Sequence, residues 1–134
     1  MKKFILMLLL LLTLNGCTNE PDTRLSCNCI KSGKNQFEAY ACPNEKPLSI
    51  IVNVPKRLFR VLGKSLTDFE YDDLSYGKLK IDDTYILHEA WRMGWAYNRN
   101  ELNRITLMFE HTFKNGREVI GYELFQCQIT NGVQ

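Results

Sequence analysis

Two histidine–carboxylate pairs are the residues of this chain whose types could do acid–base or metal chemistry. They are His88-Glu89 and Glu110-His111. Two imidazoles and two carboxylates could bind zinc if their strands were adjacent. We expect instead that His111 faces Ile120 on an apolar face and that His88 is an ordinary, partly exposed side chain at a strand end. The sequence has no HExxH motif, glycine-rich phosphate loop or nucleophile elbow, so we expect no catalytic residue, no metal and no cofactor.

An aromatic segment, residues 91–97, is the candidate for binding. Its two tryptophans, its tyrosine and its arginine are residue types that are enriched at protein interfaces. We predict a loop around Gly94 and a contact with a partner protein made by Trp91, Arg92, Trp95 and Tyr97. The alternative is that these aromatic side chains are buried in the core.

The N-terminus has the organisation of a secretory signal. Lys2 and Lys3 precede an apolar run from Phe4 to Leu14, which is shorter than the roughly 20 residues that cross a bilayer as a helix. The run is followed by Leu14-Asn15-Gly16-Cys17, in which a small residue directly precedes a cysteine. We therefore predict a signal peptide over residues 1–16.

This N-terminus resembles the lipobox of bacterial lipoproteins. The resemblance implies cleavage after Gly16 and a diacylglycerol and an acyl chain on Cys17. In that family an aspartate after the cysteine favours retention in the inner membrane. Thr18 stands there instead, which implies an outer-membrane, lipid-anchored protein. Several acyl chains together make a stable anchor.

The rest of the chain is one small domain on a short tether. Without residues 1–16 the 134-residue chain has 118 residues, enough for one modest core. The lipidated tether is expected over residues 17–26, which are polar and contain Pro21, and a single domain over residues 27–134. Loss of Lys2 and Lys3 leaves basic and acidic side chains in balance at 15 each. This balance gives no indication of a nucleic-acid partner.

The cysteines agree with export. Besides Cys17 the chain has Cys27, Cys29, Cys42 and Cys127, an even number that predicts two disulfides in a small exported domain. A bond between Cys27 and Cys29 would have to close across one residue and would be strained. Two pairings remain, namely Cys27–Cys42 with Cys29–Cys127, or Cys29–Cys42 with Cys27–Cys127. Paired cysteines favour a Gram-negative periplasm.

Alternating apolar residues predict an all-β domain. Short strands are expected over residues 37–42, 48–54, 58–62, 78–82 and 85–87. A helix over Lys56–Lys64 is the main alternative to a strand there. About seven such strands with short connections are typical of a small antiparallel meander that folds as a sandwich or barrel.

The last part of the chain predicts a long hairpin. Strands over Leu102–Phe113 and Glu118–Thr130 flank Asn115-Gly116, the preferred pair for a type I′ turn. With these two residues in the loop, Leu107 faces Leu124, Phe109 faces Tyr122 and His111 faces Ile120. On the other face, Thr106 meets Phe125 and Arg104 meets Cys127.

The last third of the chain resembles small exported bacterial β proteins. The shared pattern is an aromatic segment, then Asn103-Arg104-Ile105-Thr106, then a closing strand with Tyr122 and Cys127. The size, anchor and cysteines are also similar to those of lipoprotein inhibitors of lysozyme, although the serine- and glycine-rich inhibitory loop of that group is missing. We expect a lipid-anchored envelope protein that binds an envelope or exogenous protein in an inhibitory, assembly or protective role. The alternative function is a small-ligand carrier with a pocket inside a β-barrel, and an enzyme is the least favoured class.

Overall fold

The computed structural model describes residues 20–42, 46–62, 77–92 and 96–130, and these ranges form an all-β antiparallel domain. The nine strands of the described ranges are β1 (Thr23–Gly33), β2 (Ala39–Ala41), β3 (Leu48–Asn53), β4 (Leu58–Leu62), β5 (Gly77–Ile81), β6 (Tyr85–Arg92), β7 (Ala96–Asn103), β8 (Met108–Asn115) and β9 (Glu118–Ile129). The predicted all-β class is confirmed. The segment that could have been a helix, residues 56–64, contains strand β4.

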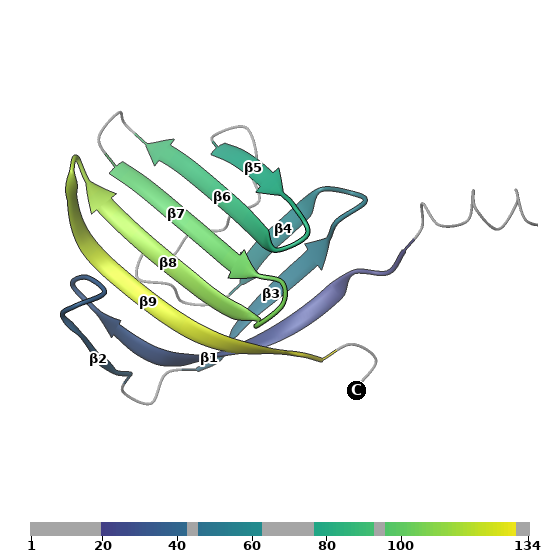
Figure 1. The fold of residues 1–134 in the computed structure, drawn as a ribbon, viewed down its shortest axis with the longest axis horizontal. Helices are drawn as coiled ribbons and strands as arrows, with labels where there is room; N and C mark the ends of the chain where they lie inside the picture. Colours follow the sequence, from purple (N-terminus) through teal and green to yellow (C-terminus); the bar gives the residue numbers. More distant parts are fainter. Residues whose placement is uncertain (1–19, 43–45, 63–76, 93–95, 131–134) are drawn as a thin grey trace, which may run out of the picture.

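All nine strands belong to one sheet. Its order is β4-β3-β1-β9-β8-β7-β6-β5, and β2 pairs with the far end of β1. The sheet curls into a half-barrel, so that β3 and β4 lie behind the strands β5 to β8 (Figure 1). β4 and β5 are therefore the two edges of the half-barrel. The Arg57 side chain, in the β3–β4 turn, bridges them at one point by donating a hydrogen bond of 2.7 Å to the Leu79 carbonyl.

The apolar core fills the inside of this curl. Phe109 is central, since its ring lies 6.3 Å from that of Phe59 and 5.8 Å from that of Phe125, measured between centroids. The buried cluster draws on both halves of the sheet and consists of Leu25, Cys27, Leu48, Ile50, Val52, Phe59, Val61, Ile86, Leu102, Phe109, Phe125 and Cys127. Burying these side chains is the main favourable contribution to folding.

Two disulfides fix the N-terminal strand. Cys27 of β1 is bonded to Cys127 of β9, and Cys29 of β1 is bonded to Cys42, just after β2. This is one of the two pairings that the sequence left open. The first bond joins residues 100 positions apart in the sequence, and its two cysteines are paired neighbours in the β1–β9 ladder.

The predicted hairpin exists as β8 and β9, but its register was wrong. Asn115 is opposite Glu118, so the loop residues are Gly116 and Arg117, and Gly116 has a φ of 62°. Further on, Lys114 is opposite Val119 whereas Phe113 is opposite Gly121, which is a β-bulge. Because a one-residue slip moves each side chain to the other face, the bulge reverses the predicted inside and outside of β9.

The corrected pairs follow from this bulge. Phe109 is opposite Phe125 and not Tyr122, and His111 is opposite Glu123 and not Ile120. Phe125 and Glu123 therefore point inward with Phe109, and Tyr122 lies on the outer face.

The strand predicted over Leu102–Phe113 is also divided by a turn. β7 ends at Asn103, whose side-chain oxygen accepts hydrogen bonds of 2.9 Å from the backbone N–H groups of Ile105 and Thr106. Leu107 then has a φ of 58°, which is uncommon for a residue with a side chain. The predicted pairs Arg104–Cys127 and Thr106–Phe125 were therefore wrong.

The strand β1 begins inside the segment that was expected to be tether. Thr23 to Ser26 pair with β3, and Leu25 is buried in the core. The predicted boundary at residue 27 was therefore four residues too late. The prediction was wrong because the segment is mostly polar and Leu25 is the one residue of its described part that packs into the core.

Candidate functional site

The outer face of β6 to β9 carries the most organised set of polar and aromatic side chains in the described ranges. Strand alternation places every second residue of these strands on this face and the others in the interior. The side chains that matter here, named below as the outer face, are Glu89, Trp91, Tyr97, Arg99, Glu101, Glu110, Lys114, Tyr122 and, on the neighbouring β1, Lys31.

Tyr97 is held by three neighbours on this face. Trp91 is opposite Tyr97 on the next strand, with ring centroids 4.6 Å apart. The Nζ atom of Lys114, on the other side, lies 5.5 Å from the centroid of the Tyr97 ring. The Tyr97 hydroxyl donates a hydrogen bond to Glu89, and burial together with this carboxylate raises the pKa of Tyr97 to about 12. Tyr97 is therefore fixed at both its ring and its hydroxyl.

A second tyrosine repeats this arrangement. The Tyr122 hydroxyl donates a hydrogen bond of 3.0 Å to Glu110, and the Nζ atom of Lys31 lies 5.7 Å from the centroid of its ring. Burial and Glu110 raise the pKa of Tyr122 to about 12. Arg99 forms ion pairs with Glu101 and Glu110 and so joins the contacts around Tyr122. The network of the outer face thus consists of two groups of contacting side chains, one around Tyr97 and one around Tyr122 and Arg99.

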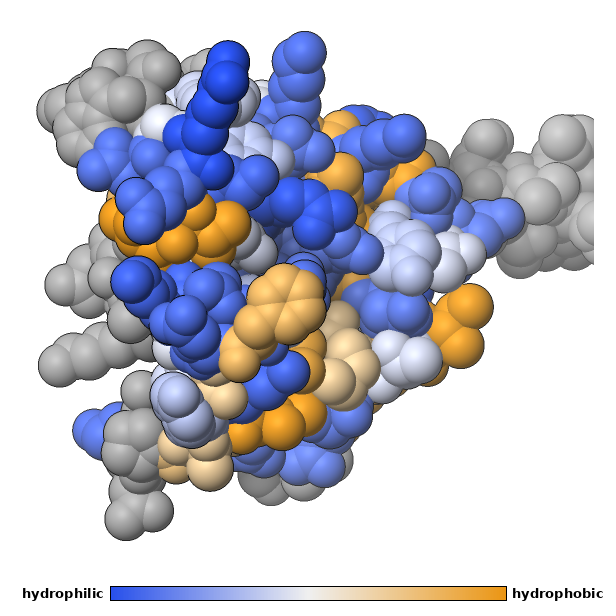
Figure 2. Space-filling model, turned by 60° about the vertical axis from the view of Figure 1, so that its left-hand side comes forward, coloured by the Kyte–Doolittle hydropathy of each residue, from blue (hydrophilic) through white to orange (hydrophobic). Residues whose placement is uncertain are grey.

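Shallow grooves border the network. One of about 350 Å³ is lined by Glu89, Trp91, Tyr97, Lys114, Gly116 and Arg117. Another of about 220 Å³ lies between the β1–β2 loop and the same sheet, where Phe37 is 87% exposed. Figure 2, with this end of the molecule brought forward, shows apolar residues interleaved with hydrophilic ones.

The predicted contact residues separate on this face. Trp91 is 55% exposed and Tyr97 only 7%. Trp91 can therefore contact a partner, whereas Tyr97 is buried and packs against Trp91. Arg92 is the last residue of β6, opposite Ala96. Trp95 lies outside the described residues. The contacts with Glu89, Glu110 and Tyr122 were not predicted, because they depend on strand register.

The two histidine–carboxylate pairs of the sequence are split by the pleat. Glu89 and Glu110 lie on the outer face, whereas His88 and His111 point inward and are each 2% exposed. The expectation that His88 is partly exposed was wrong. Neighbours on a strand point to opposite faces, so neither pair forms one site.

A polar row crosses the interior two residues along the strands from the apolar core. His88, Asn100, His111 and Glu123 are successive partners on β6 to β9, and all four are buried. The His111 ring lies between Glu123 and Asn98, with its Nδ1 atom 3.4 Å from Glu123 Oε1 and its Nε2 atom 3.2 Å from Asn98 Oδ1. These contacts orient the imidazole and compensate part of the cost of burying the carboxylate.

The described ranges contain no group of three or more histidine, cysteine, aspartate or glutamate side chains placed to hold a metal ion. Those ranges also include no helix with the length and apolar character needed to cross a membrane. A comparison of the chain with protein-family models, curated proteins and solved structures finds no match.

Proposed function

We propose that this protein is a lipid-anchored protein of the bacterial outer membrane that binds another protein through the outer face of β6 to β9. The observation that carries the proposal is the exposed Trp91 side chain, whose ring packs at a tilt of 43° against Tyr97, and Tyr97 is itself held by Glu89 and Lys114. The partner is an envelope or exogenous protein, and the role is inhibitory, protective or in assembly.

The order of the outer face supports binding. Association is opposed by the loss of side-chain freedom, at about 0.5–1.5 kcal/mol for each mobile side chain that becomes fixed. Tyr97, Tyr122 and Arg99 are already fixed by hydrogen bonds and ion pairs, so this cost is small for them. Tryptophan, tyrosine and arginine are also the residues that most often dominate binding energies at interfaces.

The position of Trp91 supports the same proposal. β1 enters the domain at Thr23, at the opposite end of the half-barrel from the end of β6 and the β8–β9 turn (Figure 1). A lipid on Cys17 would attach the chain shortly before Thr23. The Trp91 end would then face away from the anchoring bilayer, where a partner protein can approach it.

Photocrosslinking in intact cells tests this proposal. The photoreactive residue p-benzoylphenylalanine replaces Val119, which lies in the same cross-strand row as Trp91 and leaves that tryptophan in place. We expect one major protein adduct from position 119, and none from position 105, where Ile105 is 74% exposed in the β7–β8 turn. The full lipoprotein is used, with a tag after Gln134.

The lipoprotein with p-benzoylphenylalanine at position 119 is called the crosslinking chain below. Adding Trp91→Ala to it should remove most of the adduct and leave the thermal transition of the domain unchanged. Tyr40→Ala is the control, since Tyr40 is an exposed aromatic residue of β2. An adduct that is unchanged by Trp91→Ala, or the absence of any adduct from position 119, contradicts the proposal.

A further inference from the structure

The carboxylates of the outer face already have partners within the domain. Glu89 accepts a hydrogen bond from the Tyr97 hydroxyl, and Glu110 accepts one from the Tyr122 hydroxyl. Arg99 forms ion pairs with Glu110 and with Glu101. Each of these carboxylates therefore has a hydrogen-bond or ion-pair partner within the domain, and Glu89, whose partner is a neutral hydroxyl, keeps its negative charge.

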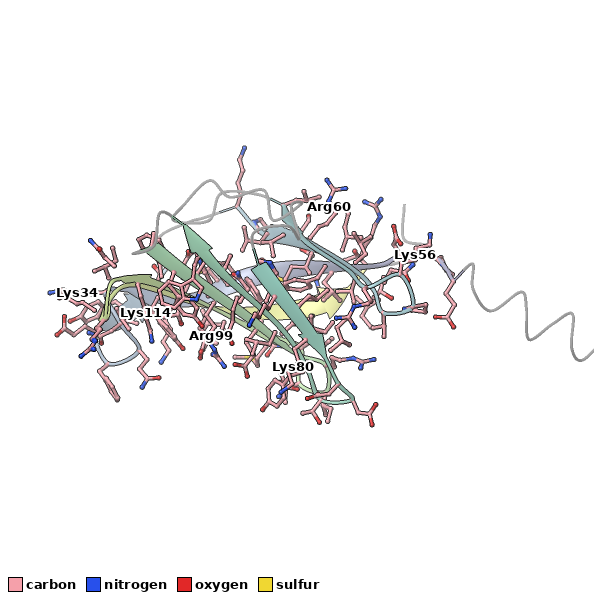
Figure 3. The ribbon with its side chains drawn as sticks, turned by 90° about the horizontal axis from the view of Figure 1, so that it is seen from above. Lys34, Lys56, Arg60, Lys80, Arg99 and Lys114 are labelled. Carbon is pink, nitrogen blue, oxygen red and sulfur yellow. A yellow bond between two sulfur atoms is a disulfide. The ribbon has the colours of Figure 1, made fainter. Side chains whose placement is uncertain are left out.

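The cations beside Trp91 are in the opposite situation. Lys114 lies over the Tyr97 ring and Arg117 is exposed in the β8–β9 turn, and within the described ranges neither forms an ion pair with a carboxylate. Both line the groove of about 350 Å³ that Trp91 also lines. Figure 3 shows Lys114 on the same side of the sheet as Arg99 and Lys80, away from Lys56 and Arg60. Glu89 lines the groove too, and its carboxylate is already hydrogen-bonded to the Tyr97 hydroxyl. The groove thus combines an exposed aromatic surface with two cations and one carboxylate, a net positive charge that favours an anionic partner.

We infer that the partner binds here through an acidic segment, whose carboxylate lies between Lys114 and Arg117 and whose neighbouring apolar side chain packs on Trp91. This inference rests on the proposed function and names the chemistry of its partner. The guanidinium of Arg117 can bind a carboxylate through two parallel hydrogen bonds, and the Lys114 ammonium adds a point charge. At about 350 Å³ this groove lies at the lower end of the range for ligand pockets and has room for one or two side chains.

A basic or purely apolar segment fits this groove less well. A basic segment would place like charges beside Lys114 and Arg117, an arrangement that interfaces avoid. An apolar segment would bury the two cations without a partner, and that desolvation is unfavourable. An acidic segment meets neither obstacle, and its attraction to the cations would also speed association.

Charge variants of the crosslinking chain test the inference. Arg117→Glu reverses the charge at an exposed turn position, and Lys114→Gln removes the charge while keeping a long side chain over Tyr97. Lys56→Glu is the control, because Lys56 lies elsewhere on the domain (Figure 3). All carry p-benzoylphenylalanine at position 119 in the full lipoprotein, and mass spectrometry identifies the crosslinked segment of the partner.

We expect the double variant of Lys114 and Arg117 to give about tenfold less adduct and the Lys56 control to give the wild-type amount. We also expect aspartate or glutamate within a few residues of the crosslinked position. An unchanged adduct in the double variant, or a crosslinked segment without an acidic residue, overturns the inference and leaves the proposed function intact. A wild-type chain that yields no protein adduct, or only a lipid adduct, overturns both.

Discussion

His88 is a buried titratable residue whose position in the polar row makes the stability of the domain depend on pH. Its side chain is 2% exposed, and the row continues on the next three strands with Asn100, His111 and Glu123. Burial lowers the pKa of His88, and the nearby Glu89 opposes this only in part. The native state therefore holds His88 as the neutral imidazole over a wider pH range than the unfolded chain does.

This difference makes stability depend on pH in a defined direction. Below an unfolded-state pKa of about 6.5, the unfolded chain binds a proton at His88 that the native state resists, so stability falls as the pH drops towards the lowered native pKa. We expect His88→Gln to reduce the loss of unfolding free energy between pH 7.5 and 5.5, by at most about 1.4 kcal/mol per pH unit. Urea unfolding of both proteins across this range measures it. Identical slopes for wild type and variant would contradict the assignment.

Residue types alone indicated Trp91 but not the network behind it. The sequence predicted equal contact roles for Trp91 and Tyr97, yet only the first is exposed. The burial of Tyr97 arises because Trp91 and Lys114 occupy the neighbouring positions on the two adjacent strands. Such cross-strand neighbours are set by register, and periodicity within one strand carries no information about register.

At the scale of the elements, strand identity was more predictable than pairing. The segments 48–54 and 58–62 contain β3 and β4, and the segment 78–82 covers all of β5 but its first residue, because these segments are rich in branched and aromatic residues. The hairpin register was wrong because Ile120 is an extra residue in β9, and the adjacent Gly121, a residue that often marks a bulge, was not used in the prediction. The division of the long predicted strand at Asn103 had no such signal, since Leu107 adopts a positive φ without being glycine.

The two disulfides differ in the length of chain that they close, and so in their effect on stability. Cys27–Cys127 spans 100 residues and Cys29–Cys42 spans 13. In the chain-entropy model these loops are worth about 4.7 and about 3 kcal/mol. We expect Cys27→Ala with Cys127→Ala to lower the unfolding free energy more than Cys29→Ala with Cys42→Ala, since the first pair also lies in the core.

Urea unfolding of the two double variants at equal protein concentration measures this order. The first loss is comparable to a large part of the 5–15 kcal/mol by which domains are stable, so that variant should unfold at low denaturant. If the pair Cys29 and Cys42 proved the more important, the constraint on β2 would outweigh loop length, and the ranking would be wrong.

The two ends of the whole molecule differ in the character of their interior. The apolar core and the Cys27–Cys127 bond hold β1 to β9. Beyond the core, the interior becomes polar, and the outer face there carries the network around Tyr97. The curl of the sheet places this network away from Thr23, where the chain enters (Figure 1). An anchored domain of this shape would present a rigid face to its surroundings, and only the anchor would determine where that face is displayed.

The cysteine pairing bears on the anchor. Cys27, Cys29, Cys42 and Cys127 are bonded among themselves, so Cys17 is not required for either disulfide. Cys17→Ala should therefore leave the fold and the thermal transition unchanged while abolishing labelling with radioactive palmitate and releasing the protein from the membrane fraction. Thr18→Asp is the matched variant, since it should keep the label and move the protein from the outer to the inner membrane on a density gradient. Labelling that survives Cys17→Ala would show that the anchor is not at this cysteine, and an unlabelled wild type would leave the outer face of β6 to β9 on a secreted protein that diffuses to its partner.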